Sequence, residues 1–237
     1  AIMVLKSNKL KNIQEKNSGR IRAVIFDMDG TLLNSEKLWF YSARKLLRRY
    51  GSDLTLKEYI AWVGRYEGEL LKKKVAEVGI SKDEEELSRE RRLIAVEMLK
   101  RFKLRPDPHL KKLISVLKRK KIILGIATGT NSELTTKFLK KVGLYGKFKC
   151  IITADDVKKR KPHPETYLKC AKRLGLKGSE ILVFEDSETG VIAAKRAGMS
   201  CIAVPNSLSR SHNFSEADLI VRNRSKLEWK TLKAWLK

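Results

Sequence analysis

The chain has 237 residues, of which 42% are hydrophobic and 33% charged, a composition typical of a soluble globular protein. No apolar run approaches the length of a membrane span, and the polar, lysine-rich stretch that follows residues 2–5 has the wrong order for a secretory signal peptide. Three widely spaced cysteines indicate reduced thiols rather than a disulfide framework or a metal site. We therefore expect a cytoplasmic protein of one large domain or two small ones.

The formal net charge of +25 raises the question of nucleic-acid binding. The positive charge is spread along the whole chain, with no isolated basic arm and no aromatic-basic motif of the RNA-binding kind. We interpret it as a field that attracts anionic ligands in general. Nonspecific adhesion to nucleic acid at low salt is expected as a side effect.

Residues 1–20 are ambiguous between a short helix and an extension, and the first clear element is a strand at 22–26. This apolar strand is followed by Asp27 and Asp29, then by Gly30 at a sharp turn. Side chains two positions apart on a strand share a face, so both carboxylates can point at one small site. Two adjacent carboxylates repel, and a bound cation or a shared proton relieves the repulsion. The alternative is that Asp-Gly simply marks a turn.

Residues 35–105 differ from the rest of the chain in composition and pattern, because helix formers dominate and no strand-like alternation is present. Apolar residues recur there at intervals of three or four, as at Leu38, Tyr41, Leu46, Leu47, Leu93, Val96, Leu99 and Leu104. Pro106 and Pro108 close the segment. The pattern predicts an all-helical domain at 35–105, inserted into a core formed by residues 1–34 and 106–237.

After residue 106, strand-like and helical stretches alternate. Strands are expected near 121–127, 150–153, 181–184, 201–204 and 218–221, and helices near 109–119, 132–142, 164–174, 189–197 and 225–236. This alternation predicts an α/β fold with a parallel sheet covered by helices on both faces. Ligands in such folds bind at the carboxyl ends of the strands. No Gly-x-Gly-x-x-Gly follows a strand, so a dinucleotide site is not supported.

Polar residues follow several of these strands. Thr128 is followed by the backbone amides of Gly129 and Thr130 at a helix N-terminus, which is a natural cradle for an oxyanion or a phosphate. Prolines flank the loop that carries Lys161, and they restrict where its side chain points. Each residue has a plainer interpretation, because Thr128 can be a helix cap and Lys161 a solvated member of a basic run.

A further strand ends in Glu185 and Asp186, which are costly after an apolar strand unless a cation meets them. Asp186 can also be an ordinary turn acid, and we interpret His163 as a loop residue. The chain resembles the haloacid dehalogenase superfamily, in its phosphatase and β-phosphoglucomutase-like branch with a helical cap. The resemblance rests on four motifs in this order: Asp27-x-Asp29-Gly30, Thr128, Lys161 and Glu185-Asp186. The resemblance implies a three-layer Rossmann-like core with an inserted all-helical cap domain.

The resemblance also implies chemical roles. Asp27 would be the nucleophile that forms an aspartyl-phosphate, and Asp29 would protonate the leaving oxygen and then deprotonate the attacking water. Thr128, Gly129 and Lys161 would bind the transferring phosphoryl group.

The implied cofactor is Mg²⁺, held by the Asp27 carboxylate, the Asp29 backbone carbonyl and Asp186, with Glu185 as a further candidate. Arg65, which follows Gly64 in the helical segment, is the candidate for contact with the organic part of the substrate. Its alternative is an ordinary surface arginine.

Our leading hypothesis is a Mg²⁺-dependent phosphatase that hydrolyses a small phosphate monoester, with the helical cap closing over the site. The alternative is a sugar-phosphate mutase that uses the same phospho-aspartate. The mutase branch carries a histidine twelve residues after the nucleophile, where this chain has Trp39. Asp29 argues against dehalogenation, because the dehalogenases lack this acid. A third hypothesis is a basic nucleic-acid-binding protein without enzymatic activity. Phosphoglycolate, a sugar phosphate and a nucleotide all suit the expected cap, and the sequence leaves the oligomeric state open.

Overall fold

A computed structural model describes residues 21–232 and shows a six-stranded sheet in the order β3-β2-β1-β4-β5-β6. The strands are β1 (Ala23–Phe26), β2 (Ile123–Ala127), β3 (Cys150–Ile152), β4 (Ile181–Glu185), β5 (Ser200–Ala203) and β6 (Leu219–Ile220). Every pair of neighbouring strands is parallel, so the predicted parallel α/β sheet is confirmed. The expectation for residues 1–20 lies outside the described residues.

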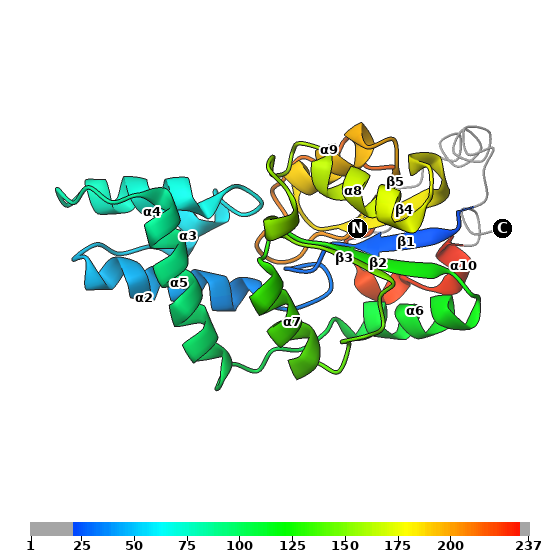
Figure 1. The fold of residues 1–237 in the computed structure, drawn as a ribbon, viewed down its shortest axis with the longest axis horizontal. Coiled ribbons are helices and arrows are strands. Elements are labelled where there is room, and N and C mark those ends of the chain that lie inside the picture. The colour runs from blue at the N-terminus through cyan, green and yellow to red at the C-terminus, as the bar shows by residue number, and fades with distance from the viewer. Residues whose placement is uncertain (1–20, 233–237) are drawn as a thin grey trace. The chain divides into compact units, whose positions relative to one another are not determined.

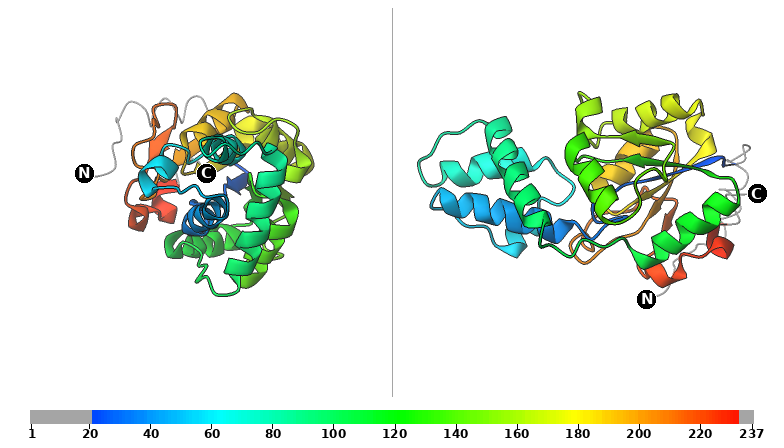
Figure 2. Two further views of the ribbon diagram at one scale, coloured as in Figure 1. Left: turned by 90° about the vertical axis from the view of Figure 1, so that its left-hand side faces the viewer. Right: turned by 60° about the horizontal axis from the view of Figure 1, so that its bottom comes forward.

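Helices cover both faces of this sheet, as Figures 1 and 2 show. They are α6 (Pro108–Arg119), α7 (Ser132–Lys141), α8 (Glu165–Leu174), α9 (Glu188–Arg196) and the short α10 (Trp229–Leu232). The helices α8 and α9 lie on one face, while α6 and α10 lie on the other. The strand β1 is fully buried, as expected for the centre of a sheet covered on both sides. Within the described residues, no helix combines the length and the apolar character needed to cross a membrane.

The chain divides into two compact units, which we call the sheet unit (residues 1–33 and 106–237) and the helical unit (residues 34–105). The helical unit contains α2 (Glu36–Arg49), α3 (Leu56–Ile60), α4 (Glu67–Ala76) and α5 (Glu84–Leu99). Both α2 and α4 pack against α5. Thr55 caps α3 with a reciprocal capping box, and Asp83 caps α5 by accepting two backbone N–H bonds. Asn34 groups with the helical unit, whereas the sequence placed it with the core.

Some local expectations were wrong. Leu93, expected on the apolar face of its helix, is 66% exposed, because the buried face of α5 is shifted by one position and contains Ile94 and Ala95. The single helix expected at 225–236 is instead a 3₁₀ turn at Arg224–Lys226 followed by α10, within the part that the structure describes. The strand expected from residue 121 begins at Ile123, because the backbone before it turns through a left-handed residue, Lys121 (φ 58°).

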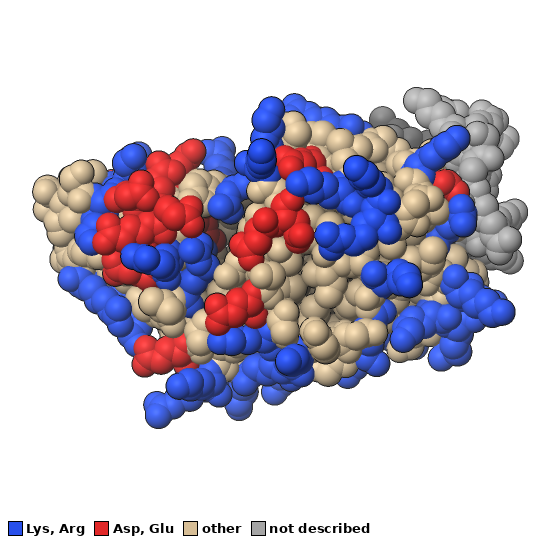
Figure 3. Space-filling view, in the orientation of Figure 1, with Lys and Arg blue, Asp and Glu red and all other residues tan. Residues whose placement is uncertain are grey.

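Charged side chains are unevenly distributed on the face shown in Figure 3. Lys and Arg are spread widely over it, whereas Asp and Glu gather in a few groups. On this face, the distribution fits a diffuse positive field better than a single basic binding patch. Nonspecific adhesion to nucleic acid stays a prediction.

Candidate active site

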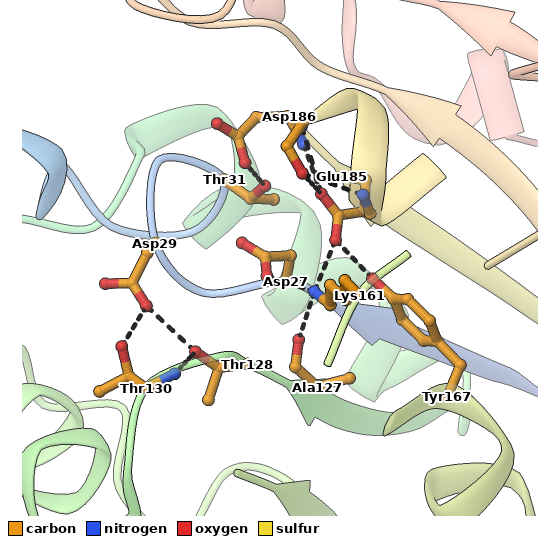
Figure 4. A network of polar contacts seen from close by, with 12 residues as sticks. Asp27, Asp29, Thr31, Ala127, Thr128, Thr130, Lys161, Tyr167, Glu185 and Asp186 are labelled. Carbon is orange, nitrogen blue, oxygen red and sulfur yellow. Dashed lines mark hydrogen bonds and ion pairs between the residues drawn. The ribbon is translucent and has the colours of Figure 1, made fainter. Parts of the chain in front are cut away.

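Polar residues meet at the carboxyl edge of the sheet, because neighbouring parallel strands end on the same side. Asp27 directly follows β1, Thr128 follows β2, Glu185 is the last residue of β4, and Asp186 comes next. Lys161 reaches the same place from the loop that precedes α8. Figure 4 shows Asp27, Lys161, Glu185 and Asp186 close together above the sheet.

Lys161 is the centre of this group. Its Nζ lies 2.7 Å from Asp27 Oδ1 and 2.6 Å from Glu185 Oε1, and it also donates to the carbonyl of Ala127 at 3.1 Å. Burial alone would lower the pKa of Lys161, but the negative charges of Asp27 and Glu185 outweigh burial and hold that pKa above its ordinary value. Lys161 therefore carries a permanent positive charge beside Asp27.

Glu185 is fully buried, and both of its carboxylate oxygens are engaged. Besides Lys161, Oε1 accepts a hydrogen bond from the Tyr167 hydroxyl at 2.7 Å, while Oε2 accepts from Ser187 Oγ and from the backbone N–H groups of Asp186 and Ser187. A side chain at Gly190 would collide with this carboxylate, so the glycine leaves it room. These contacts hold Glu185 rigidly against Lys161.

Three carboxylates form a cluster suited to a metal ion. The side-chain oxygens of Asp27, Glu185 and Asp186 lie within 4.8 Å of one another, and all three residues are buried. With all three acids ionised, the cluster would hold three negative charges against one ammonium group, and a divalent cation would balance that charge. Burial, partly offset by Lys161, raises the pKa of Asp27 well above its ordinary value, and the neighbouring Glu185 and Asp29 charges raise it further. Oxygen ligands of this kind fit a hard divalent cation.

Two neutral donors orient Asp186. The Thr31 hydroxyl donates to Asp186 Oδ1 at 2.8 Å, and the Asn206 amide donates to Oδ2 at 2.7 Å. The amide also reaches the carbonyl of Gly30 at 3.3 Å, which ties Asp186 to the loop after Asp27. Partners of this kind fix the orientation of a metal ligand without adding charge.

Asp29 points away from this cluster, toward two threonines after β2 (Figure 4). The hydroxyls of Thr128 and Thr130 both donate to Asp29 Oδ2, at 3.0 and 2.7 Å. The carboxylates of Asp27 and Asp29 therefore flank the site instead of sharing one face, because β1 ends at Phe26 and the backbone turns at Gly30 (φ 77°). The predicted metal contact of Asp29 is its backbone carbonyl, and that contact stays a prediction.

The predicted anion cradle after β2 is only partly present. The Thr130 N–H donates to Thr128 Oγ1 at 3.0 Å, so this amide already has a partner inside the protein. Gly129 is exposed, and a Cβ there would meet no atom within 4 Å, so there is open space beside this residue. Asn131 caps α7, so the interpretation of Thr128 as the helix cap is wrong.

Comparison with known proteins identifies the family. The family model described as haloacid dehalogenase-like hydrolase matches residues 24–204. The chain belongs to this family. The resemblance noted from the sequence motifs is therefore confirmed, together with the Rossmann-like core.

Two curated relatives of this haloacid dehalogenase-like hydrolase are phosphatases by name. A phosphorylated carbohydrates phosphatase from Thermotoga maritima is 33% identical over 205 residues, covering 84% of this chain and 93% of the relative. The fructose-1-phosphate phosphatase YqaB from Escherichia coli is 32% identical over 187 residues, covering 78% of this chain and 97% of the relative.

Solved structures agree with the fold. CbbY from Rhodobacter sphaeroides in complex with phosphate is 26% identical, with a TM-score of 0.77, and the match covers 87% of this chain and 96% of CbbY. A β-phosphoglucomutase from Clostridium difficile is 23% identical with a TM-score of 0.78, covering 91% of this chain and 97% of that chain. The second likeness shows the fold alone.

Several contributors to the site were missed in the sequence. No role was predicted for Tyr167, the Thr130 hydroxyl or Asn206. Asn206 nevertheless comes shortly after β5. Polar residues that follow a parallel strand lie at the edge of the sheet where ligands bind, which is the reason that Asp186 was predicted. Arg224 had no detectable signal, yet its guanidinium donates to the carbonyls of Gly30, Thr31 and Val204 and pairs with Asp107. Arg224 therefore clamps the loop after Asp29 to Val204 and Asp107 of the sheet unit.

Proposed function

We propose that this haloacid dehalogenase-like hydrolase is a Mg²⁺-dependent phosphatase acting on small phosphorylated sugars or sugar-like metabolites. Phosphoric monoester hydrolysis is the activity that its phosphatase relatives share. The observation that carries the proposal is the buried Asp27 carboxylate, which lies 2.7 Å from Lys161 and belongs to the same acidic cluster as Asp186. A nucleophile, a fixed cation and a metal-type cluster are the parts that phosphoryl transfer requires.

In the proposed first step, a carboxylate oxygen of Asp27 forms a bond to phosphorus while the bond from phosphorus to the ester oxygen breaks. Asp29 gives a proton to that leaving oxygen. In the second step a water molecule attacks the phosphorus, Asp29 takes the proton of the water, and the bond between Asp27 and phosphorus breaks. Inorganic phosphate leaves, and both aspartates return to their starting states.

The proposed part of Lys161 is to neutralise the phosphoryl oxygens while Asp27 attacks. The carboxylates of Asp27 and Asp186 would hold Mg²⁺, which supplies further positive charge at the phosphoryl group. For Glu185 we propose a supporting part, because its oxygens already contact Lys161, Tyr167 and the backbone after β4. Its candidacy as a metal ligand stays a prediction. The hydroxyl of Thr128, now on Asp29, can rotate toward a bound phosphate.

A panel of phosphate esters tests the proposal directly. Phosphate release would be measured for hexose phosphates, glycerol phosphate, phosphoglycolate and nucleoside monophosphates, with Mg²⁺ and with a chelator. We expect the sugar phosphates to be hydrolysed fastest and the chelator to abolish turnover. Asp27→Asn should abolish it as well, whereas Glu216→Gln, at an exposed position, should not. Wild-type rates in the Asp27→Asn variant would disprove the nucleophile assignment.

The mutase alternative is disfavoured by Trp39. This residue is buried in α2, with the guanidinium of Arg91 4.7 Å from the centre of its ring, and an indole cannot shuttle a proton as a histidine does. Phosphorus NMR of a hexose 1-phosphate incubation separates the two functions. Inorganic phosphate as the single product supports the phosphatase, and conversion to the hexose 6-phosphate supports the mutase.

A further inference from the structure

Two buried cysteines lie in direct contact at the edge of the sheet. Cys150 is the first residue of β3, and Cys170 is on α8, which packs against that strand. Their sulfur atoms are 3.1 Å apart, and their side chains are 2% and 0% exposed. The catalytic loop with Lys161 lies between them in the sequence.

The sulfur–sulfur distance is short for two separate thiols. Carbon atoms, which are smaller than sulfur, prefer a non-bonded separation of about 3.5–4.0 Å, and a disulfide bond is about 2.05 Å long. A movement of about 1 Å therefore brings the two sulfur atoms to bonding distance. The chain places the two thiols in a position to react with each other and with no other cysteine.

The two thiols differ in acidity. The hydrogen bond that Cys170 donates lowers the pKa of Cys150, against the opposing effect of burial, and the charge of Arg173 lowers it further. The same hydrogen bond raises the pKa of Cys170, and burial adds to this effect. Cys150 is therefore the more acidic thiol of the pair.

We propose that Cys150 and Cys170 form an intrachain disulfide that links β3 to α8 and encloses the loop with Lys161 in a covalent ring. With hydrogen peroxide as the oxidant, the Cys150 thiolate attacks one oxygen, the O–O bond breaks, and hydroxide leaves to become water. The sulfur of Cys170 then attacks the sulfenic acid on Cys150, so that the S–S bond forms and a second water leaves. Two thiols lose two electrons and two protons, and the peroxide is reduced to water.

Cys201 offers a matched control within the same chain. It is a buried free thiol on β5, and β5 is separated from β3 by three strands. At the spacing of neighbouring strands, this places it about 19 Å from Cys150 across the sheet. It shares the burial of the pair and lacks a sulfur partner.

The test uses the full chain, folded and treated with hydrogen peroxide, then alkylated in denaturant without reductant. We expect one alkylated thiol, at Cys201, and an unalkylated pair at the other two positions. Trypsin cleaves after Lys149, Lys158, Lys169 and Lys172, so the disulfide would join peptides 150–158 and 170–172. We also expect the midpoint of thermal unfolding to be about 5–10 °C higher in the oxidised than in the reduced protein, because the bond restricts the unfolded chain.

The variants separate the proposal from its alternatives. Cys201→Ser should keep the linked peptides and the reductant-dependent midpoint, whereas Cys150→Ser and Cys170→Ser should lose both. Three alkylated thiols in the peroxide-treated wild type would overturn the proposal, and so would a bond that includes Cys201 or joins two chains. The wild-type measurement stands by itself if a serine variant fails to fold.

Discussion

Replacing Lys161 with methionine removes the ammonium group that contacts the acidic cluster and keeps an unbranched apolar side chain in its place. Its ammonium group is 2.7 Å from Asp27 and 2.6 Å from Glu185. At an effective dielectric constant of about 20, each contact corresponds to about 6 kcal/mol of attraction, most of which burial of the charges cancels. Breaking a buried pair from one side typically costs about 3–5 kcal/mol, and we expect that loss in the free energy of unfolding of Lys161→Met.

Lys161→Met should also hydrolyse its substrate more slowly than the wild type. Loss of one preorganised charge at a reacting group typically lowers kcat by about 10²–10³-fold. Stability would be measured by urea unfolding followed by circular dichroism, and turnover with p-nitrophenyl phosphate under conditions where the variant is folded. The matched control is Lys159→Met, in the same loop, whose side chain is exposed. If Lys161→Met stayed within tenfold of the wild-type kcat, the part assigned to this lysine would be refuted.

Three further predictions concern the metal, the loop and the substrate. Asp186→Asn should weaken Mg²⁺ binding, measured by calorimetry without substrate, by about 10- to 100-fold, and an unchanged affinity would exclude Asp186 as a ligand. Hydrogen bonds from Lys169 and from two backbone N–H groups lower the pKa of Glu165 from 4.5 to about 2. The ionised Glu165 therefore stabilises the folded protein fully above pH 4.5, and this stabilisation is lost as the pH falls toward 2. Glu165→Gln should therefore be less stable than wild type in urea at pH 7 and equal to it near pH 2; a difference that persists near pH 2 contradicts this. Arg65→Ala should raise KM for the preferred sugar phosphate about tenfold and spare kcat, and an unaltered KM would make it an ordinary surface arginine.

The parts of the site that the sequence could predict are those that follow from strand ends. Asp27, Asp186 and Thr128 each come directly after an apolar strand, and parallel pairing brings such positions to one edge. The chemistry of two nearby acids then indicated a cation. These positions follow from the order of residues along the chain and from the parallel pairing of the strands.

The parts that escaped prediction depend on directions and on distant contacts. The spacing of Asp27 and Asp29 predicted a shared face, but the strand ends before either residue, so the alternation of a strand does not apply to them. Tyr167 contacts Glu185 across 18 residues of sequence, and Arg224 contacts Thr31 across 193. Periodicity within one element carries no information about such pairs, because the tertiary fold creates them.

The Arg224 clamp has a consequence for the order in which the site is assembled. The chain emerges from the ribosome N-terminus first, so Asp27 and Asp29 are available long before Arg224 has been synthesised. The carbonyls of Gly30 and Thr31 acquire this guanidinium only after β6 has been synthesised. A nascent chain that ends after β5 contains Asp27, Glu185 and Asp186 but lacks Arg224, whose guanidinium holds the carbonyls of Gly30 and Thr31. We therefore expect the loop that contains Gly30 and Thr31 to be fixed in place only after the segment with Arg224 has folded against it.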